Sequence, residues 1–313
     1  MKILIVGGAG YIGGHLTDYL LGDLADVTVY DSLIYEQRFL KDVPFIYGDI
    51  RDRDKLSKIL PDFDVVIWLA AIVGDGACAI DPFFTQAVNE DSVKWFVDNY
   101  DGKIVFMSTC SVYGTNSELI DEDAPTNPLS IYASTKLAAE QYIVNNAKDF
   151  LIFRLGTLYG IGDCFSRIRF DLVVNVLTKK ATLGEKLTVF GGNQWRPLLH
   201  VKDVASAVFH GLRSDITGLY NLAQGNHTIL QIAEMIKCII PDTVIECQDK
   251  EFEDLRNYKV NCDKFLETNW AASRTLGEGI NEVHKLIIDH RIKNVDDPIY
   301  SNEFYINDHY FKL

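Results

Sequence analysis

The sequence predicts a doubly wound α/β domain, together with a smaller α/β domain that is partly interleaved with it. Three observations support this fold class. Short apolar runs alternate with helix-like stretches in the first half of the chain, a glycine-rich turn joins the first run to a helix, and the alternation loosens after about residue 155. Wholly apolar strands separated by helices are typical of a parallel sheet that is buried on both faces.

Short apolar runs are the expected strands of the first domain. They are Ile3–Val6, Val27–Tyr30, Pro44–Tyr47, Asp64–Leu69 and Lys103–Met107. Helical spacing of apolar residues predicts the first helix over 11–21. In the second half of the chain we expect a helix over 171–182, a strand over 187–190, a helix over 200–211 and a strand over 219–222 that returns to the first sheet.

Composition limits the classes of function. The 313 residues are 48% hydrophobic and 24% charged, an ordinary globular mixture. A net charge of -14 opposes binding to nucleic acid or to an anionic membrane surface. The cysteines are far apart and the histidines lack ligand spacing, so we expect reduced thiols and no metal site. The N-terminus reads as a strand and a turn, and no apolar run is long enough to span a bilayer, so we expect a cytoplasmic protein.

A glycine-rich turn, GGAGYIG at residues 7–13, follows the first strand and opens a helix. In such a turn Gly7 permits the sharp change of direction, Gly10 lets the backbone approach a pyrophosphate, and Gly13 lets the helix pack close to the strand. The helix N-terminus then faces the anion. The turn therefore predicts a dinucleotide-binding domain of the Rossmann type.

Two carboxylates extend this prediction. Asp31 ends the second strand, where a carboxylate can accept hydrogen bonds from an adenosine ribose and would repel a 2′-phosphate. Ser32 and Leu33 follow it instead of an arginine, so NAD is favoured over NADP. Asp49, after the third strand, is placed to meet the adenine ring. We assign residues 1–165 to the dinucleotide-binding domain, with 198–222 returning to it, and residues 166–197 and 223–313 to the second domain.

The chemistry-bearing residues follow the fifth strand. Thr109 lies in STCSVYG at 108–114, at the sheet edge where open α/β sheets bind ligands. Tyr132 and Lys136 lie one helical turn apart, so the lysine ammonium is close to the phenol. An adjacent cation and an oxidised nicotinamide favour the phenolate, which can accept a hydroxyl proton near neutral pH.

These motifs together resemble the extended short-chain dehydrogenases/reductases of the NAD-dependent epimerase/dehydratase type, which act on nucleotide sugars. The matching segments are GGAGYIG at 7–13, Asp31, GDIRD at 48–52, LAA at 69–71, STCSVYG at 108–114 and YASTK at 132–136. The resemblance implies that Tyr132 is the base, that Lys136 holds the nicotinamide ribose and that Thr109 completes the triad. The implied NAD-binding residues are Gly7, Gly10, Tyr11, Ile12, Gly13, Asp31, Asp49, Ile50, Leu69, Ala70, Ala71, Tyr132 and Lys136.

The resemblance continues into the second domain. It implies that the substrate is a nucleotide-diphospho-sugar bound between the domains and touched by Thr109. Asn175 matches a residue that contacts the nucleotide phosphates, and Arg196 and Arg256 match arginines that clamp the diphosphate or the nucleotide ribose. Guanidinium groups suit a diphosphate inside an acidic protein. The family also implies a homodimer through the helices near residues 83–99 and 130–147.

One departure from the relatives narrows the reaction. The 4,6-dehydratases carry an Asp-Glu pair where this chain has Cys110 and Ser111. Without that pair, elimination lacks its proton donor and acceptor, so a dehydratase is disfavoured and Cys110 is interpreted as a small buried residue. The remaining reaction is oxidation of the sugar C4 hydroxyl, catalysed by an NDP-sugar 4-epimerase or by a net 4-dehydrogenase. A 4-ketoreductase stays open, and a non-enzymatic dinucleotide sensor is disfavoured because the Tyr132–Lys136 pair and Thr109 are kept.

The residues do not identify the nucleotide base or the sugar. The last stretch of the chain, 296–313, is rich in aromatic residues: Tyr300, Phe304, Tyr305, Tyr310 and Phe311. An ordinary packed tail is the favoured interpretation of this stretch, with a cover over a cleft or a partner as the alternative.

Overall fold

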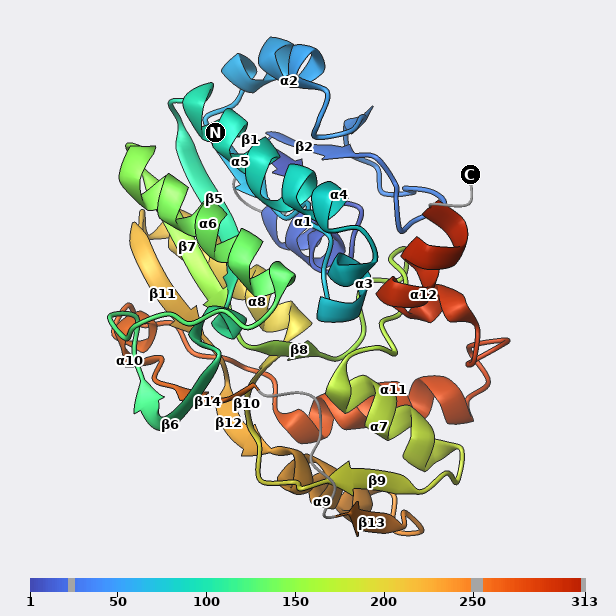
Figure 1. Cartoon of the computed structure of the whole chain (residues 1–313). Coiled ribbons are helices and arrows are strands. Elements are labelled where there is room, and N and C mark those ends of the chain that lie inside the picture. The colour runs from blue at the N-terminus through green and yellow to red at the C-terminus, as the bar shows by residue number, and fades with distance from the viewer. Residues whose placement is uncertain (22–25, 249–255, 311–313) are drawn as a thin grey trace.

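A parallel sheet of seven strands forms the centre of the molecule (Figure 1). The computed structural model describes residues 1–21, 26–248 and 256–310. In spatial order the strands are β11 (Gly218–Leu222), β7 (Phe150–Leu155), β5 (Lys103–Thr109), β4 (Val65–Trp68), β1 (Lys2–Val6), β2 (Asp26–Asp31) and β3 (Phe45–Tyr47). Every neighbouring pair is parallel. The predicted doubly wound fold class is therefore confirmed.

Helices cover both faces of this sheet. On one face lie α1 (Gly13–Leu21) and α8 (Val201–Arg213), which pack against each other. The helices of the other face are α2 (Arg53–Ile59), α3 (Asp75–Ile80), α4 (Pro82–Gln86), α5 (Ser92–Asp98) and α6 (Ile131–Asn146). The sheet is thus the middle of three layers.

Strand β1 shows why the strands are apolar throughout. Ile3 and Ile5 pack into the core under α1 and α8, whereas Leu4 and Val6 pack into the core under α5 and α6. All four side chains are fully buried. Because successive residues of a strand point to opposite faces, a sheet covered on both sides needs an apolar residue at every position.

The strand order places the ligand site. From β1 the chain proceeds to β2 and β3 on one side, and from β4 it proceeds to β5 and β7 on the other. Loops that follow neighbouring strands therefore diverge between β1 and β4. In open α/β sheets, ligands bind in the crevice beyond the carboxyl ends of the strands at this point.

A smaller group of elements lies beyond that edge (Figure 1). It comprises α7 (Val173–Thr182), β9 (Leu187–Phe190), α9 (Ile229–Ile239), β13 (Ile245–Gln248) and α11 (Leu276–Ile288). The three helices share a core of their own, separate from the two cores of the large sheet. Helices α9 and α11 both begin with a capping box, Thr228 with Gln231 and Thr275 with Glu278, which fixes where each starts.

Two small sheets join the parts. One contains β12 (Gly225–Thr228), β10 (Trp195–His200) and β8 (Thr157–Tyr159), and the other pairs β14 (Asn257–Val260) with β6 (Thr115–Ile120). The chain leaves the large sheet after β7 and returns to it with β11. The division into two domains at residue 165 stays a prediction.

The C-terminal stretch crosses back to the first layers. After α10 (Asp263–Leu266) and α11 come a short turn, Pro298–Tyr300, helix α12 (Asn302–Tyr305) and a wide turn, Ile306–Tyr310. Helix α12 packs against α3, more than two hundred residues earlier in the chain (Figure 1). Phe311 lies outside the described residues.

Candidate active site

The glycine turn after β1 is held by close backbone packing. Gly7 has a φ of +83°, and a Cβ at this position would lie 2.4 Å from the backbone nitrogen of Ala70. A Cβ on Gly13 would lie 2.3 Å from the carbonyl oxygen of Gly8. At Gly10, among the residues that the structure describes, a Cβ would meet only the Gly7 oxygen, at 3.5 Å. Gly7 and Gly13 thus shape the turn, while Gly10 leaves open space beside it.

This turn opens into a cavity of about 170 Å³, hereafter the smaller cavity. Most residues predicted to bind the dinucleotide line it. They are Gly7, Gly10, Tyr11, Ile12, Gly13, Asp31, Asp49, Ile50, Leu69, Ala70 and Ala71. They come from the ends of adjacent parallel strands, so the sheet itself brings them together.

Two carboxylates mark the smaller cavity. Asp31 accepts hydrogen bonds from the backbone N–H groups of Ala9, at 3.0 Å, and Leu33, at 2.7 Å. Burial raises the pKa of the Asp31 carboxyl, and these donors oppose that change. Asp49 is paired with Arg51, 2.6 Å from its guanidinium. Burial alone would raise the pKa of Asp49, but the hydrogen bonds from Arg51 outweigh it and lower the pKa.

A second cavity of about 590 Å³, the larger cavity, adjoins the first at Tyr11, Ile12, Leu69 and Ala71. Thr109, Tyr132 and Lys136 all line it. Thr109 is the last residue of β5, and Tyr132 and Lys136 lie one turn apart on α6. Strand and helix therefore bring the three predicted catalytic side chains to one wall.

Burial dominates the electrostatics of this wall. It raises the pKa of the Tyr132 phenol, and a hydrogen bond with Thr109 opposes that change. Burial also lowers the pKa of Lys136 to about 7. The lysine nitrogen lies 4.0 Å from the centroid of the Phe106 ring. Both shifts favour the uncharged forms of the two side chains while no further charge is present.

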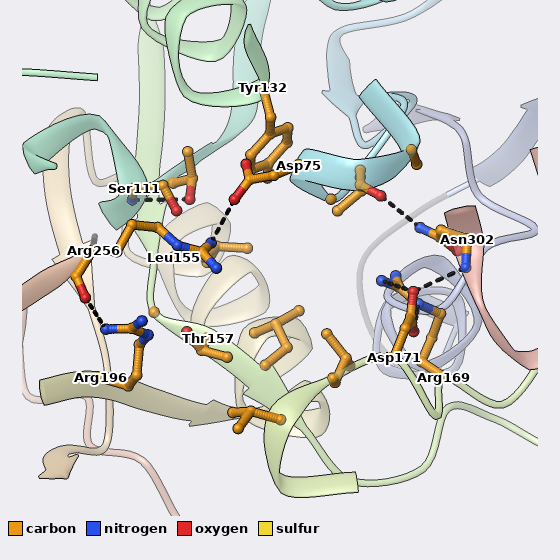
Figure 2. Close-up of a pocket in the computed structure, with 18 of the residues that line it drawn as sticks. Asp75, Ser111, Tyr132, Leu155, Thr157, Arg169, Asp171, Arg196, Arg256 and Asn302 are labelled. Carbon is orange, nitrogen blue, oxygen red and sulfur yellow. Dashed lines mark hydrogen bonds and ion pairs between the residues drawn. The ribbon is translucent and has the colours of Figure 1, made fainter. Parts of the chain in front are cut away.

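The two predicted arginines also line the larger cavity, where Figure 2 shows Arg256 beside Ser111 and Arg196 on the same side of the cavity as Arg256. Arg196 donates hydrogen bonds to the carbonyl oxygens of Trp195, at 2.8 Å, and Arg256. Arg256 forms an ion pair with Asp75, 3.1 Å between nitrogen and oxygen. A further hydrogen bond, 2.7 Å long, runs from Ser130 to the Asp75 carboxylate. Asp75 opens α3 and thus links this helix to Arg256.

The comparisons with known proteins fit this geometry. The profile of the NAD dependent epimerase/dehydratase family matches residues 3–223. The chain belongs to this family. It is 30% identical over 303 residues to a putative UDP-glucose 4-epimerase of Methanocaldococcus jannaschii, with 90% of this chain and 96% of that protein covered.

Solved structures of the epimerase/dehydratase family share the fold. UDP-glucose 4-epimerase of Thermus thermophilus, in complex with NAD, is 26% identical with a TM-score of 0.78, covering 91% of this chain and 98% of that one. UDP-glucuronic acid 4-epimerase of Bacillus cereus, in complex with UDP-glucuronic acid and NAD, is also 26% identical, with a TM-score of 0.77 and coverage of 92% and 99%. The predicted NAD cofactor is thereby confirmed.

The residues that line the smaller cavity suit NAD. The N-terminus of α1 supplies backbone N–H groups for a diphosphate, and the open space at Gly10 permits close approach. Asp31 offers oxygens to a ribose. Arg167 and Tyr35 also line this cavity. Among the described residues, the buried Arg167 Nε and Tyr35 hydroxyl have no hydrogen-bond partner. Phosphate and ribose oxygens would satisfy such donors.

Asn175 is not brought to either cavity. Its side chain is fully buried and belongs to the lining of neither one. Its amide nitrogen donates to the carbonyl oxygens of Gly160 and Arg169, each at 2.9 Å, and its oxygen accepts from Gly160 N–H at 3.0 Å. Gly160 has a φ of +94°. In this structure the amide therefore holds a tight turn and does not face the ligand space.

Cys110 is also turned away from the cavities. Its side chain is fully buried, and its sulfur donates to the carbonyl oxygen of Arg154 at 3.1 Å. Burial raises the pKa of the thiol well above its usual value. Ser111, the next residue, lines the larger cavity instead. The structure thus places a serine hydroxyl in the larger cavity two residues after Thr109, and neither Cys110 nor Ser111 is an acid.

The larger cavity also contains polar residues that the sequence did not predict: Asp75, Arg169, Asp171, Tyr258 and Asn302. Tyr258 lies 3.4 Å from the Ser111 hydroxyl, oxygen to oxygen. It could have been found, because it follows Arg256 by two residues in an extended segment and alternate residues share a face. Figure 2 shows Arg169, Asp171 and Asn302 on the side of the cavity away from Arg196.

The sequence predicts neither a membrane-spanning helix nor a metal site. Within residues 1–21, 26–248 and 256–310, no helix is long and apolar enough to cross a membrane. Over the same ranges, no group of three or more His, Cys, Asp or Glu side chains is arranged to hold a metal ion.

Proposed function

We propose that this protein is a nucleotide-sugar 4-epimerase that oxidises the C4 hydroxyl of a UDP-sugar to a 4-keto sugar and reduces it again. One observation carries the proposal. Thr109, Tyr132 and Lys136 line the same cavity as Arg196 and Arg256. The UDP-glucose 4-epimerases and the UDP-glucuronic acid 4-epimerase among the similar proteins support the choice of UDP and of C4.

The proposed proton transfer runs through Tyr132. When bound, NAD supplies the hydride acceptor for C4 and a positively charged nicotinamide ring that favours the phenolate. Tyr132 then takes the proton of the C4 hydroxyl as general base. The Thr109 hydroxyl holds the same oxygen and relays the proton. Lys136 positions the nicotinamide ribose and, once protonated, stabilises the phenolate from one turn below. In the return step Tyr132 gives the proton back as general acid.

The proposed substrate contacts line the same cavity as the three catalytic side chains. Arg196 and Arg256 bind the diphosphate, since a planar guanidinium can donate two parallel hydrogen bonds to phosphate oxygens. Arg256 must then exchange its ion pair with Asp75 for one with the phosphate. Ser111 and Tyr258 present hydroxyl groups to the sugar. Turning the 4-keto sugar over between oxidation and reduction changes the face of C4 that receives the hydride.

The alternatives differ in what happens to the 4-keto sugar. A net 4-dehydrogenase would release it and leave NADH, and a 4-ketoreductase would run the same step backwards. A 4,6-dehydratase stays disfavoured because the thiol of Cys110 is buried outside the larger cavity. Ser111 cannot replace a carboxylic acid in elimination, because a hydroxyl has too high a pKa to act as a ready donor.

The experiment is a product assay on a panel of nucleotide sugars. The purified protein is incubated with NAD and UDP-glucose, UDP-glucuronic acid or UDP-N-acetylglucosamine, and matching CDP-, GDP- and dTDP-sugars serve as controls. Absorbance at the NADH band is followed and products are analysed by NMR. A changed C4 configuration without lasting NADH supports the epimerase. Stoichiometric NADH supports the dehydrogenase, loss of the C6 hydroxyl supports the dehydratase, and no turnover of any sugar opposes an enzyme of this class.

Assembly and location remain predictions. The predicted homodimer would form through the helices near residues 83–99 and 130–147, where α5 and α6 pack side by side. Light scattering coupled to gel filtration measures the mass in solution, and a monomer at micromolar concentration would contradict the prediction. The expected location in the cytoplasm is checked by fractionation of the source cells.

A further inference from the structure

Arg167 connects the smaller cavity to the C-terminal stretch of the chain. Its guanidinium lies over two neighbouring tyrosine rings, 5.0 Å from the centroid of Tyr35 and 5.4 Å from that of Tyr305. Its two terminal nitrogens donate to the carbonyl oxygen of Ile299 and to the side-chain oxygen of Asn302. A single buried side chain thus contacts a loop after β2 and the segment around α12.

Two donors at this point are buried without a partner. Among the described residues, the Arg167 Nε and the Tyr35 hydroxyl have no hydrogen-bond partner, and both residues line the smaller cavity. Nearly all buried polar groups in native proteins are hydrogen-bonded, so such a pair points to a missing acceptor. Both groups are donors, and the acceptors that suit them are anionic or hydroxyl oxygens.

The α12 segment, residues 298–306, is fixed by Asn302. The amide nitrogen of Asn302 donates to the carbonyl oxygen of Val73 at 2.9 Å, and its backbone N–H donates to the Asp171 carboxylate at 2.9 Å. Asp171 is itself paired with Arg169, at 2.6 Å. Asn302 is 3% exposed and lines both cavities. The α12 segment therefore forms part of the wall where the two cavities meet (Figure 2).

We propose that Arg167 and Tyr35 are NAD-binding residues that donate hydrogen bonds to oxygens of its ADP moiety, and that Arg167 thereby fastens the α12 segment over the bound cofactor. The assignment to the ADP moiety follows from the place of these donors, in the cavity formed by the glycine turn and Asp31. The aromatic C-terminal stretch, expected as a packed tail, is then a cover. The side chains of Tyr310 and Phe311 lie outside the described residues.

This proposal deepens the proposed function and partly rests on it. A cofactor that is released slowly keeps the hydride inside the protein, and the same sugar can take it back. Slow release thus favours a 4-epimerase over a net dehydrogenase, which must exchange NADH in every cycle. NAD binding can be measured without any sugar, so failure of the proposed reaction leaves the binding result intact.

The experiment measures NAD and ADP-ribose binding by isothermal titration, and NAD release after desalting into excess labelled NAD. The variants are Tyr35→Phe, which removes only the hydroxyl, and Arg167→Lys, which keeps the charge but loses Nε. Tyr300→Phe is the matched control, since Tyr300 lies in the same C-terminal stretch but outside both cavity linings. Each test variant should weaken NAD and ADP-ribose by about tenfold and speed NAD release, because one buried hydrogen bond is lost.

The α12 segment supplies a second readout. NAD should slow proteolysis of the C-terminal stretch in the parent protein and in Tyr300→Phe, and should protect less in Arg167→Lys. Thermal unfolding without NAD shows whether a variant has lost its fold. If Arg167→Lys does not fold, the NAD and ADP-ribose affinities of the isosteric variant Tyr35→Phe test the proposal. Unchanged NAD and ADP-ribose affinity in a folded Tyr35→Phe, or loss of NAD affinity with ADP-ribose affinity unchanged, would overturn the proposal.

Discussion

The two cavities of this protein are built in different ways. The smaller cavity takes most of its lining from residues that follow β1, β2, β3 and β4 or end these strands, no later in the chain than Val73. The larger cavity combines side chains from distant segments, including Asp75, Tyr132, Arg196 and Arg256. The sheet places the first set, whereas long-range packing places the second. Cofactor binding should therefore depend most on backbone geometry, and catalysis and substrate binding on individual side chains.

The largest effect expected is at Tyr132. Tyr132→Phe keeps the ring and removes the group that exchanges the proton, so turnover should fall on the order of 10³-fold. The affinity for NAD should fall by no more than about tenfold, because one hydroxyl at the nicotinamide end is lost while the smaller cavity is unchanged. Steady-state rates on the active sugar and titration with NAD measure the two quantities. Substantial residual turnover would remove Tyr132 from the proposed role.

Two glycine variants test the claim about backbone geometry. Gly7→Ala places a Cβ 2.4 Å from Ala70 N in a backbone with φ of +83°, so it should destabilise the protein by about 2–4 kcal/mol. Gly10→Ala meets only one atom, at 3.5 Å, so the fold should persist while NAD binds about tenfold more weakly. Urea unfolding and NAD titration separate the outcomes. Equal behaviour of both variants would contradict the distinction drawn for the turn.

Variants of the Asp75–Arg256 pair test whether substrate binding depends on individual side chains. Arg256→Met should weaken binding of UDP by about ten- to a hundredfold, since a charge-assisted contact to phosphate is lost. Asp75→Asn removes the competing carboxylate, so it should tighten UDP binding by about threefold. NAD affinity should not change in either variant. Weaker UDP binding in Asp75→Asn would show that the carboxylate supports the arginine and does not compete for it.

The smallest effect expected lies away from both cavities. Glu282 accepts hydrogen bonds from His200 and Lys202, each at 2.9 Å. Burial alone would raise its pKa, but these hydrogen bonds outweigh it and lower the pKa from 4.5 to about 2. A lowered folded-state pKa stabilises the protein above the unfolded value of 4.5, and the contribution is lost as pH falls toward 2.

Glu282→Gln should therefore cost about 1 kcal/mol near pH 7 and progressively less below pH 4.5. Urea unfolding at a series of pH values measures the difference, and binding of NAD and UDP near neutral pH should not change. A difference that is constant across the series would show that Glu282 acts through packing and not through charge.

The difference between residues placed by the sheet and residues placed by long-range packing also explains what the sequence could predict. The fold class followed from apolar runs such as Ile3–Val6, because a strand covered on both faces has no polar position. The positions of Gly7, Gly13 and Asp31 beside one cavity could be predicted because they depend on residues a few positions away and on the strand that each follows or ends. The closeness of Tyr132 and Lys136 could be predicted for the same reason, since they are one helical turn apart.

The remaining site residues have no local signature. Arg167 and Asn302 meet only because the C-terminal stretch packs against α3, and no periodic pattern announces that contact. Asp75 acquires its partner Arg256 from the residue just before β14, about 180 positions later in the chain. Asn175 shows the reverse case, since an amide that matched a phosphate contact is instead bonded to the turn at Gly160. Tertiary packing decides all of these positions.

The pairing of β14 with β6 has a consequence for how the protein folds. Asn257 lies opposite Thr115, about 140 residues earlier in the chain. Closing so long a loop is slow and entropically costly, so this contact forms after the local structure on either side of it. The β14–β6 pair is also what carries Arg256 and Tyr258 to the wall that begins at Thr109. Refolding should therefore restore UDP binding only after the strands and helices on either side have formed, and the interval between the two events would time the closure of this strand pair.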